Sequence, residues 1–309
     1  MRALAVTNPS ATAMSPRTRD VIMRALGSEL KIDEVETTRR GHAADLAAQA
    51  RRDTFDLVIA VGGDGTVNEV VDGLLRDGLS PDVPRLAVVP GGSANVFARA
   101  LGLPAEPIEA TGAVIERLRA RQERVIGLGL LDADPFRRWF TFCAGFGLDA
   151  EVVREVERRR AAGARATPAL YARAGLRQFV ATDRRRPALT VEAGSREPIE
   201  SVFMAIVTNT TPWTYFGPRP LQPTPEASFD AGLDAFLLRR LGTLGTANKL
   251  RRLFSGKRPN GRHSLTLHDQ PALRLRASRP LAAEVDGEYL GEFTTARLES
   301  VPEALAVIA

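Results

Sequence analysis

The sequence predicts two domains: an α/β domain with a doubly wound, mostly parallel sheet, followed by a mostly antiparallel β-sandwich domain. The chain has 309 residues, whereas single domains usually have roughly 100 to 200. Up to about residue 124, apolar strand-length segments alternate with helical segments, and beyond it strand-length segments predominate. We therefore assign residues 1–124 to the first domain and residues 125–309 to the second, whose last residues are candidates to pack back on the first.

The composition is that of a soluble globular protein. Hydrophobic residues make up 44% of the chain and charged residues 26%, which is enough apolar material for a substantial core. A single cysteine, Cys143, excludes an intramolecular disulfide framework and a cysteine-built zinc cage. We find no secretory leader and no apolar stretch near the ~20 residues of a membrane-spanning helix. We therefore expect a cytoplasmic protein whose membrane contact is peripheral, at the inner face of the membrane.

The net charge of +5 comes from 42 basic and 37 acidic residues, and the basic residues are almost all arginine. Because this bias, with the abundant alanine, is typical of a GC-rich genome, we predict no nucleic-acid partner. Two basic helical segments, residues 154–177 and 249–258, either face solvent or meet an anionic membrane, where each basic residue near the surface contributes about 1 kcal/mol. The oligomeric state stays open, with a dimer among the options.

The first domain is predicted to alternate strands and helices. Strands are expected at residues 3–7, 32–37, 57–61 and 85–89, and helices at residues 15–30, 42–52, 67–78 and 96–101. The strand at residues 57–61 is a continuous apolar run without polar alternation. Such strands are typical of a parallel sheet that helices cover on both faces.

The second domain is predicted to be mostly strands. They are expected at residues 125–131, 139–144, 189–192, 202–209, 233–238, 264–268, 272–277 and 281–285. A basic helical stretch interrupts them at residues 149–182, and a second helix is expected at residues 243–254. This order favours an antiparallel sandwich.

The sharpest motif is Gly62-Gly63-Asp64-Gly65-Thr66, which joins the strand at residues 57–61 to the helix that follows. Glycines at a strand-to-helix turn let the backbone approach a ligand, and the helix N-terminus favours phosphate. A carboxylate at Asp64 would repel phosphates unless it coordinates Mg²⁺ or takes a proton. The motif therefore predicts a phosphate-binding turn in which Asp64 coordinates Mg²⁺ or takes a proton; the alternative is a tight turn in which Asp64 caps the helix.

Two further turns have the same context. Pro90-Gly91-Gly92-Ser93-Ala94-Asn95 follows the strand at residues 85–89, and Asn8-Pro9-Ser10 follows the first strand. Because ligands of open α/β sheets bind outside the carboxyl ends of the strands, we expect these turns to lie near the first motif. Gly91 and Gly92 would let the backbone come close to the bound ligand, and Ser93 and Asn95 would supply hydrogen-bond donors.

The chain resembles the bacterial diacylglycerol kinase-like lipid kinases, to which sphingosine kinases are related. The matching pieces, in family order across nearly the whole chain, are Asn8-Pro9, Thr37 with Gly41-His42-Ala43, Gly62 to Glu69, Pro90 to Arg99, Gly145 to Ala150 and Asp286-Gly287-Glu288. The resemblance implies an ATP-binding α/β domain and a β-sandwich that receives the lipid. It implies ATP contacts at Asn8, Pro9, Ser10, Ala11, Thr12, Thr37, Gly62, Gly63, Asp64, Gly65, Thr66, Val67, Asn68 and Ser93.

The resemblance also implies that Glu288 accepts the proton of the lipid hydroxyl. The chemistry agrees, because an alcohol of very high pKa needs a nearby carboxylate as the phosphoryl bond forms, a step that contributes about 10²- to 10⁴-fold. Without the resemblance, Asp286-Gly287-Glu288 would be taken as a β-turn between strands at residues 281–285 and 290–294.

The sequence departs from the family pattern at three positions. Thr12 stands in place of a glycine, Val96 in place of an aspartate, and Ala231 in place of the second acid of an Asp-Asp-Gly metal segment. A metal site at this segment would use Asp230 and the backbone carbonyls of Ser228 and Leu233. The loss of carboxylates thins the expected Mg²⁺ network.

The main hypothesis is an ATP- and Mg²⁺-dependent lipid kinase that transfers the γ-phosphoryl group to a lipid hydroxyl, foremost that of diacylglycerol, giving phosphatidic acid. Asp64 would organise metal and phosphates, and Glu288 would activate the acceptor. Two alternatives remain: a kinase with a soluble acceptor, as in NAD kinases, and a nucleotide- or lipid-binding protein that has lost turnover along with the missing carboxylates.

Overall fold

The computed structural model describes residues 1–11, 14–164, 167–183 and 186–309, which form two compact units. Unit 1 comprises Met1–Gly127 together with Glu303–Ala309, and unit 2 comprises Leu128–Pro302. Within the described residues, no helix combines the length and the apolar character needed to cross a membrane.

Unit 1 is built on a parallel sheet. Its strands β1 (Arg2–Thr7), β2 (Lys31–Glu36), β3 (Leu57–Gly62) and β4 (Arg85–Pro90) lie in the order β2-β1-β3-β4. The end of β16 (Glu288–Val307) continues the sheet beside β4, where Val307 pairs with Leu86. Every residue of β3 is buried, as the continuous apolar run predicts for a strand covered on both faces.

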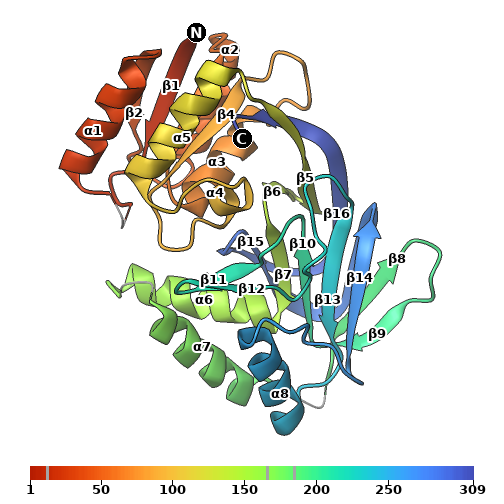
Figure 1. Ribbon diagram of the computed structural model, residues 1–309. Helices are drawn as coiled ribbons and strands as arrows, with labels where there is room; N and C mark the ends of the chain where they lie inside the picture. Colours follow the sequence, from red (N-terminus) through yellow and green to blue (C-terminus); the bar gives the residue numbers. More distant parts are fainter. Residues whose placement is uncertain (12–13, 165–166, 184–185) are drawn as a thin grey trace. The chain divides into compact units, whose positions relative to one another are not determined.

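Helices cover both faces of this sheet (Figure 1). They are α1 (Pro16–Gly27), α2 (His42–Arg52), α3 (Asp64–Leu74), α4 (Val96–Ala100) and α5 (Pro107–Ala120). Helix α1 packs with α5 and α2 packs with α3. The strand order reverses between β1 and β3, and ligands of doubly wound sheets bind outside the carboxyl ends of strands at such a point. The loops after these two strands therefore define the place to look for a site.

Unit 2 is dominated by antiparallel strands. They are β5 (Arg124–Ala133), β6 (Phe136–Phe140), β7 (Cys143–Gly147), β8 (Leu189–Ala193), β9 (Ile199–Val202), β10 (Met204–Thr208), β11 (Thr214–Phe216), β12 (Arg219–Leu221), β13 (Leu233–Leu238), β14 (Ser264–Gln270), β15 (Ala272–Val285) and most of β16. The first half of β15 pairs with β8 and the second half with β7, so one strand serves both layers of the sandwich.

Side chains in the sheet of unit 2 alternate between two apolar clusters. In β10, Ala205 and Val207 face the core of the sandwich. Ile206 faces a second cluster, which includes Phe179 of α7 (Pro168–Ala181). This period of two places one sheet face in the sandwich and the other under helices. The remaining helices of unit 2 are α6 (Leu148–Ala161) and α8 (Thr243–Phe254). The predicted fold class is thereby confirmed: an α/β domain followed by an antiparallel β-sandwich.

Several predicted boundaries are wrong in detail. Helix α3 begins at Asp64 and ends at Leu74, not at residues 67–78, because the glycine motif itself forms the first helical turn. The strand expected at residues 139–144 is two strands, β6 and β7. Those expected at residues 272–277 and 281–285 are one strand, β15, that continues through an irregularity in register. The helical stretch at residues 149–182 is divided into α6 and α7, and α5 was not predicted.

Candidate active site

The two glycine turns of unit 1 pack backbone against backbone. Gly91 N donates a 2.8 Å hydrogen bond to Gly62 O. A Cβ added at Gly92 would lie 2.7 Å from the Cα of Gly63, closer than Cβ atoms come to other heavy atoms in proteins. Glycine is therefore required here by the close approach of the turns rather than by an unusual φ angle. The prediction that the two turns lie side by side is correct.

Asp64 is the first residue of α3 and is half-buried beside the second turn. Its Oδ1 accepts a 3.1 Å hydrogen bond from the backbone N–H of Phe97 in α4. The carboxylate thus links the starts of two helices, next to the backbone at Gly63 and Gly65. Anions and carboxylates are stabilised at helix N-termini, so the first turn of α3 can hold phosphate and Asp64 can hold a cation beside it.

The loop after β1 joins this site through Asn8. Asn8 Nδ2 donates to Thr66 Oγ1 at 3.0 Å, and Asn8 Oδ1 accepts from Ser10 N at 2.9 Å. Pro9 and Ser10 are exposed, and Ala11 would be 3.2 Å from a Cβ added at Gly91. Three loops, those after β1, β3 and β4, are therefore in contact at the carboxyl edge of the sheet. Thr12, for which an ATP contact is implied, lies outside the described residues.

The side chains of Val67 and Asn68 lie inside unit 1, with 2% and 1% of their surface exposed. Asn95 is also buried, and its amide bonds at both ends with Gly92: Oδ1 accepts from Gly92 N at 2.8 Å and Nδ2 donates to Gly92 O at 2.9 Å. These three side chains support the loops, whereas Ser93 is exposed at the tip of the second turn.

Glu69 ends the first motif, and its role was missed in the sequence. Its Oε1 accepts from Gly41 N at 2.7 Å and its Oε2 from Ala43 N at 3.2 Å, so it caps the N-terminus of α2. Gly41 has φ +80°, a conformation that favours glycine. Thr37, at the start of this loop, donates its N–H to Thr7 O at 2.8 Å. Glu69 and Gly41-His42-Ala43 both belong to the motifs that match the family. This shared membership was the signal in the sequence that could have indicated their contact.

In unit 2, Glu288 directly follows the turn Asp286-Gly287 between β15 and β16. The two turn residues have φ +49° and +80°, as in the tight two-residue hairpin turns that Asp-Gly favours. The Asp286 carboxylate is buried and accepts from Thr141 N and Oγ1, Phe142 N and Cys143 N at 2.7 to 3.0 Å. Glu288 Oε2 lies 3.5 Å from Arg138 Nη2, and its side chain is 20% exposed. The β-turn that the sequence suggests is therefore present, and the same turn positions Glu288 at the start of β16.

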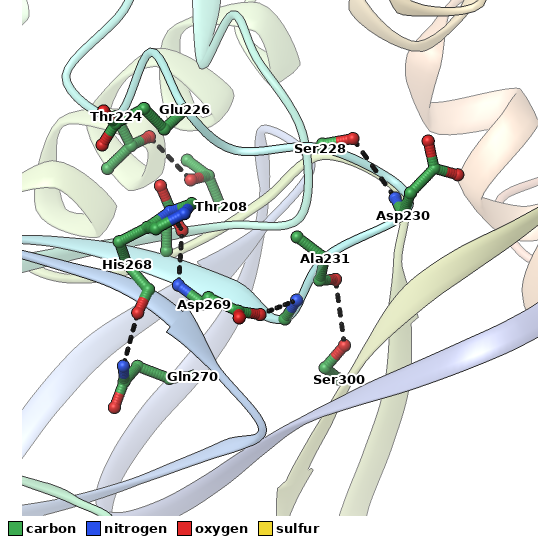
Figure 2. Close-up of polar contacts among 12 residues, drawn as sticks. Thr208, Thr224, Glu226, Ser228, Asp230, Ala231, His268, Asp269, Gln270 and Ser300 are labelled. Carbon is green, nitrogen blue, oxygen red and sulfur yellow. Dashed lines mark hydrogen bonds and ion pairs between the residues drawn. The ribbon is translucent and has the colours of Figure 1, made fainter.

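The loop before β13 holds the residues of the expected second metal site (Figure 2). Ser228 Oγ accepts from Asp230 N at 3.3 Å, Ala231 O accepts from Ser300 Oγ at 3.5 Å, and Leu233 begins β13. Asp230 is exposed. Among the described residues no group of three or more acidic, histidine or cysteine side chains is arranged to hold a metal ion. A metal site at Ser228, Asp230 and Leu233 stays a prediction.

Comparison with protein families matches nearly the whole chain. Residues 2–129 match the diacylglycerol kinase catalytic domain, and residues 143–309 match the YegS C-terminal NAD kinase β-sandwich-like domain. The chain belongs to the diacylglycerol kinase-like lipid kinase family. The family assignment that the motifs predict is thereby confirmed, and this lipid kinase is an ATP-dependent enzyme.

Among its relatives, the lipid kinase is 29% identical to the "Probable lipid kinase YegS-like" protein of Stenotrophomonas maltophilia, over 92% of this chain and 88% of that one. It is 40% identical to the diacylglycerol kinase of Bacillus subtilis over 39% of this chain and 36% of that one. The crystal structure of a diacylglycerol kinase from Bacillus anthracis is similar with a TM-score of 0.71 and 18% identity, over 99% of this chain and 96% of that one. At this identity the structural similarity shows a shared fold.

Proposed function

We propose that this lipid kinase transfers the γ-phosphoryl group of ATP to the hydroxyl of diacylglycerol and so forms phosphatidic acid. The observation that carries the proposal is the contact of three loops at the carboxyl edge of the parallel sheet, where glycine backbones and the first turn of α3 surround Asp64. The acceptor is taken from relatives named diacylglycerol kinase, such as that of Bacillus subtilis.

In the proposed nucleotide site, backbone N–H groups at Gly63 and Gly65 bind the ATP phosphates, and the second turn, whose Gly92 N–H is held by Asn95, packs beside them. Thr66 and Asn8 hold the first and third loops together through their 3.0 Å hydrogen bond, and the exposed Ser93 adds a hydroxyl donor. Val67, Asn68 and Asn95 support these contacts from inside the unit. Phosphoryl transfer depends mainly on positioning and charge stabilisation, and rigid backbone donors supply both.

The residues at this site fit Mg²⁺. Mg²⁺ in kinases is usually held by one or two carboxylates together with substrate phosphates, and Asp64 is a half-buried carboxylate next to the proposed phosphate site. Bound there, the ion would neutralise charge on the phosphates. Asp64 itself keeps α3 and α4 in register through Phe97 N, so it both orients the site and supplies an oxygen ligand.

Glu288 is proposed to accept the proton of the lipid hydroxyl. The turn before it is anchored by Asp286, whose four hydrogen bonds leave the position of the next residues well defined. Arg138 pairs with Glu288 at 3.5 Å and restricts the orientation of its carboxylate. A carboxylate held in this way can take a proton in the transition state.

We further propose that α7 and α8 contact anionic membrane lipid. Leu176 and Val180 of α7 are 68% and 70% exposed, and Leu244 of α8 is 88% exposed. Arg177 in α7 and Arg251 in α8 add positive charge. Exposed apolar side chains with basic neighbours are typical of helices that lie in a membrane interface.

The roles of Asp64 and Glu288 are tested by isosteric variants. Glu288→Gln should lower kcat for diacylglycerol by about 10²- to 10⁴-fold, and Asp64→Asn by about 10²- to 10³-fold, because each loses a charge needed in the transition state. The exposed Glu292→Gln and Asp77→Asn serve as matched controls. Activity within twofold of wild type in either test variant would remove that residue from its role.

A further inference from the structure

Two buried carboxyl groups next to the Glu288 turn take part in no step described above. Asp149 lies in the first turn of α6 and is 8% exposed, and Glu284 lies in β15 and is 1% exposed. A Cβ added at Gly145 of β7 would be 2.2 Å from Asp149 Oδ2 and 2.6 Å from Glu284 Oε1. The two carboxyl groups therefore share the space that Gly145 leaves open, and no other residue type fits at Gly145.

Among the described residues, no basic side chain is one of the groups that act most strongly on either carboxyl group. Asp149 Oδ2 is buried and has no hydrogen-bond partner within the described part of the chain. The charges that act most strongly on Glu284 are those of Asp149 and Asp286, and both are negative. Burial raises the pKa of Asp149 to about 7, and burial followed by the charge of Asp149 raises the pKa of Glu284. Two carboxylates this close cannot both be ionised in a low-dielectric site, so the partner that Oδ2 lacks is a proton.

We propose that Asp149 and Glu284 share a proton at neutral pH, and that this protonated pair is the positioning element for Glu288. The proposal rests on the proposed role of Glu288 in phosphoryl transfer. Glu284 Oε2 accepts a 2.7 Å hydrogen bond from Gly287 N, one residue before Glu288. The protonated Oε1 can donate to Asp149, whose negative charge the N-terminus of α6 favours. Glu284 thus holds the turn from one side, while Asp286 holds it from the other.

The surroundings explain why the loss of this proton would matter. Cys143 Sγ of β7 lies 3.7 Å from Glu284 Oε1, and burial raises the pKa of this thiol, so it stays neutral. The charges of both carboxyl groups act on the hydroxyl group of Tyr171 in α7. The charges of Arg160 and Glu157 in α6 act on the same hydroxyl group. A second negative charge on the pair would face the charge of Asp286 across the turn. We therefore expect the turn to loosen, and turnover to fall, as the pair loses its last proton at alkaline pH.

The pH dependence of turnover tests the proposal. Glu284→Gln keeps both contacts, because the amide oxygen can accept from Gly287 N and the amide nitrogen can donate to Asp149, yet it cannot ionise. We expect Glu284→Gln to keep kcat within about threefold at pH 7 and to lose the alkaline fall of wild type, as expected when the ionising group is removed. Glu284→Ala should lower kcat about tenfold or more with the KM for ATP within twofold, because the contact to Gly287 is lost. The exposed Glu292→Gln, in the same hairpin, should retain the wild-type profile.

An alkaline limb that is unchanged in Glu284→Gln would overturn the positioning role. The proton itself is measured without catalysis, by infrared difference spectra of wild type against Glu284→Gln at pH 7. We expect a carbonyl band of a protonated carboxyl group that shifts in D₂O, is lost in Glu284→Gln and is kept in Glu292→Gln. Absence of this band overturns the shared proton. A protein that shows the band but phosphorylates no lipid refutes the proposed function and leaves the proton pair standing.

Discussion

Replacing Glu284 by glutamine should stabilise unit 2 at neutral and alkaline pH. The pKa of Glu284 is raised in the folded protein by burial and by Asp149, so the folded state keeps a proton that the unfolded chain releases above its ordinary pKa of about 4.3. The contribution of Glu284 to the free energy of unfolding of wild type should therefore be highest at low pH and fall as pH rises toward the folded pKa of this group. Glutamine has no proton to retain, so its curve should be flatter.

The magnitude follows from the cost of holding one proton. Each pH unit between the unfolded and the folded pKa changes the free energy of unfolding by about 1.4 kcal/mol. The difference therefore grows with pH above the unfolded pKa for as long as the folded protein keeps its proton. Glu284→Gln should match wild type near pH 4 and exceed it by a margin that widens as the pH rises toward 8.

Urea unfolding followed by tryptophan fluorescence measures the difference in free energy of unfolding between wild type and Glu284→Gln in unit 2. The chain has two tryptophans, Trp139 and Trp213, and both lie in unit 2. Titrations at pH 5, 6, 7 and 8 should show the two curves diverging, while Glu292→Gln should follow wild type. Parallel curves for wild type and Glu284→Gln would refute the raised pKa and, with it, the retained proton.

Three other perturbations test the nucleotide site and the membrane surface. Gly92→Ala should weaken the binding of a non-hydrolysable ATP analogue about tenfold or more, because its Cβ would lie 2.7 Å from Gly63 Cα. Calorimetry measures the affinity, and an unchanged affinity would contradict the role of the contact between the turns. Glu69→Ala should lower stability by about 1 to 3 kcal/mol in thermal unfolding, because two N–H groups of the α2 terminus lose their acceptor, whereas the exposed Glu116→Ala should not. Vesicle sedimentation should show binding that needs anionic lipid, falls with salt and weakens in Leu176→Ser; equal binding to neutral vesicles would reject the α7 surface.

The sequence predicted the elements whose signals are local. The apolar run of β3 and the glycines after it locate a buried strand and a phosphate-type turn, and the contact between Gly63 and Gly92 follows from the rule that parallel strands end at one edge. The start of α3 was placed three residues late because glycine is a weak helix former. In the structure the capping position of Gly63 and the helix packing outweigh that propensity.

The contacts that sequence could not supply are long-range. The strand expected at residues 139–144 is broken because the Asp286 carboxylate takes the N–H groups of Thr141, Phe142 and Cys143 from the far end of the chain. Asp149 and Glu284 come from distant parts of the sequence. Only the fold brings α6 and β15 together at Gly145, where the two carboxyl groups meet. Single-sequence patterns carry no information on such pairings.

The most direct measurement of the central claim is product identification. The purified chain is incubated with radiolabelled ATP, Mg²⁺ and a mixed lipid extract that also contains NAD⁺, and labelled products are identified by mass spectrometry. We predict that diacylglycerol gains the γ-phosphate and appears as phosphatidic acid. Label recovered in NADP⁺, in another lipid alone, or in no product despite ATP binding would contradict the assignment of diacylglycerol as the acceptor.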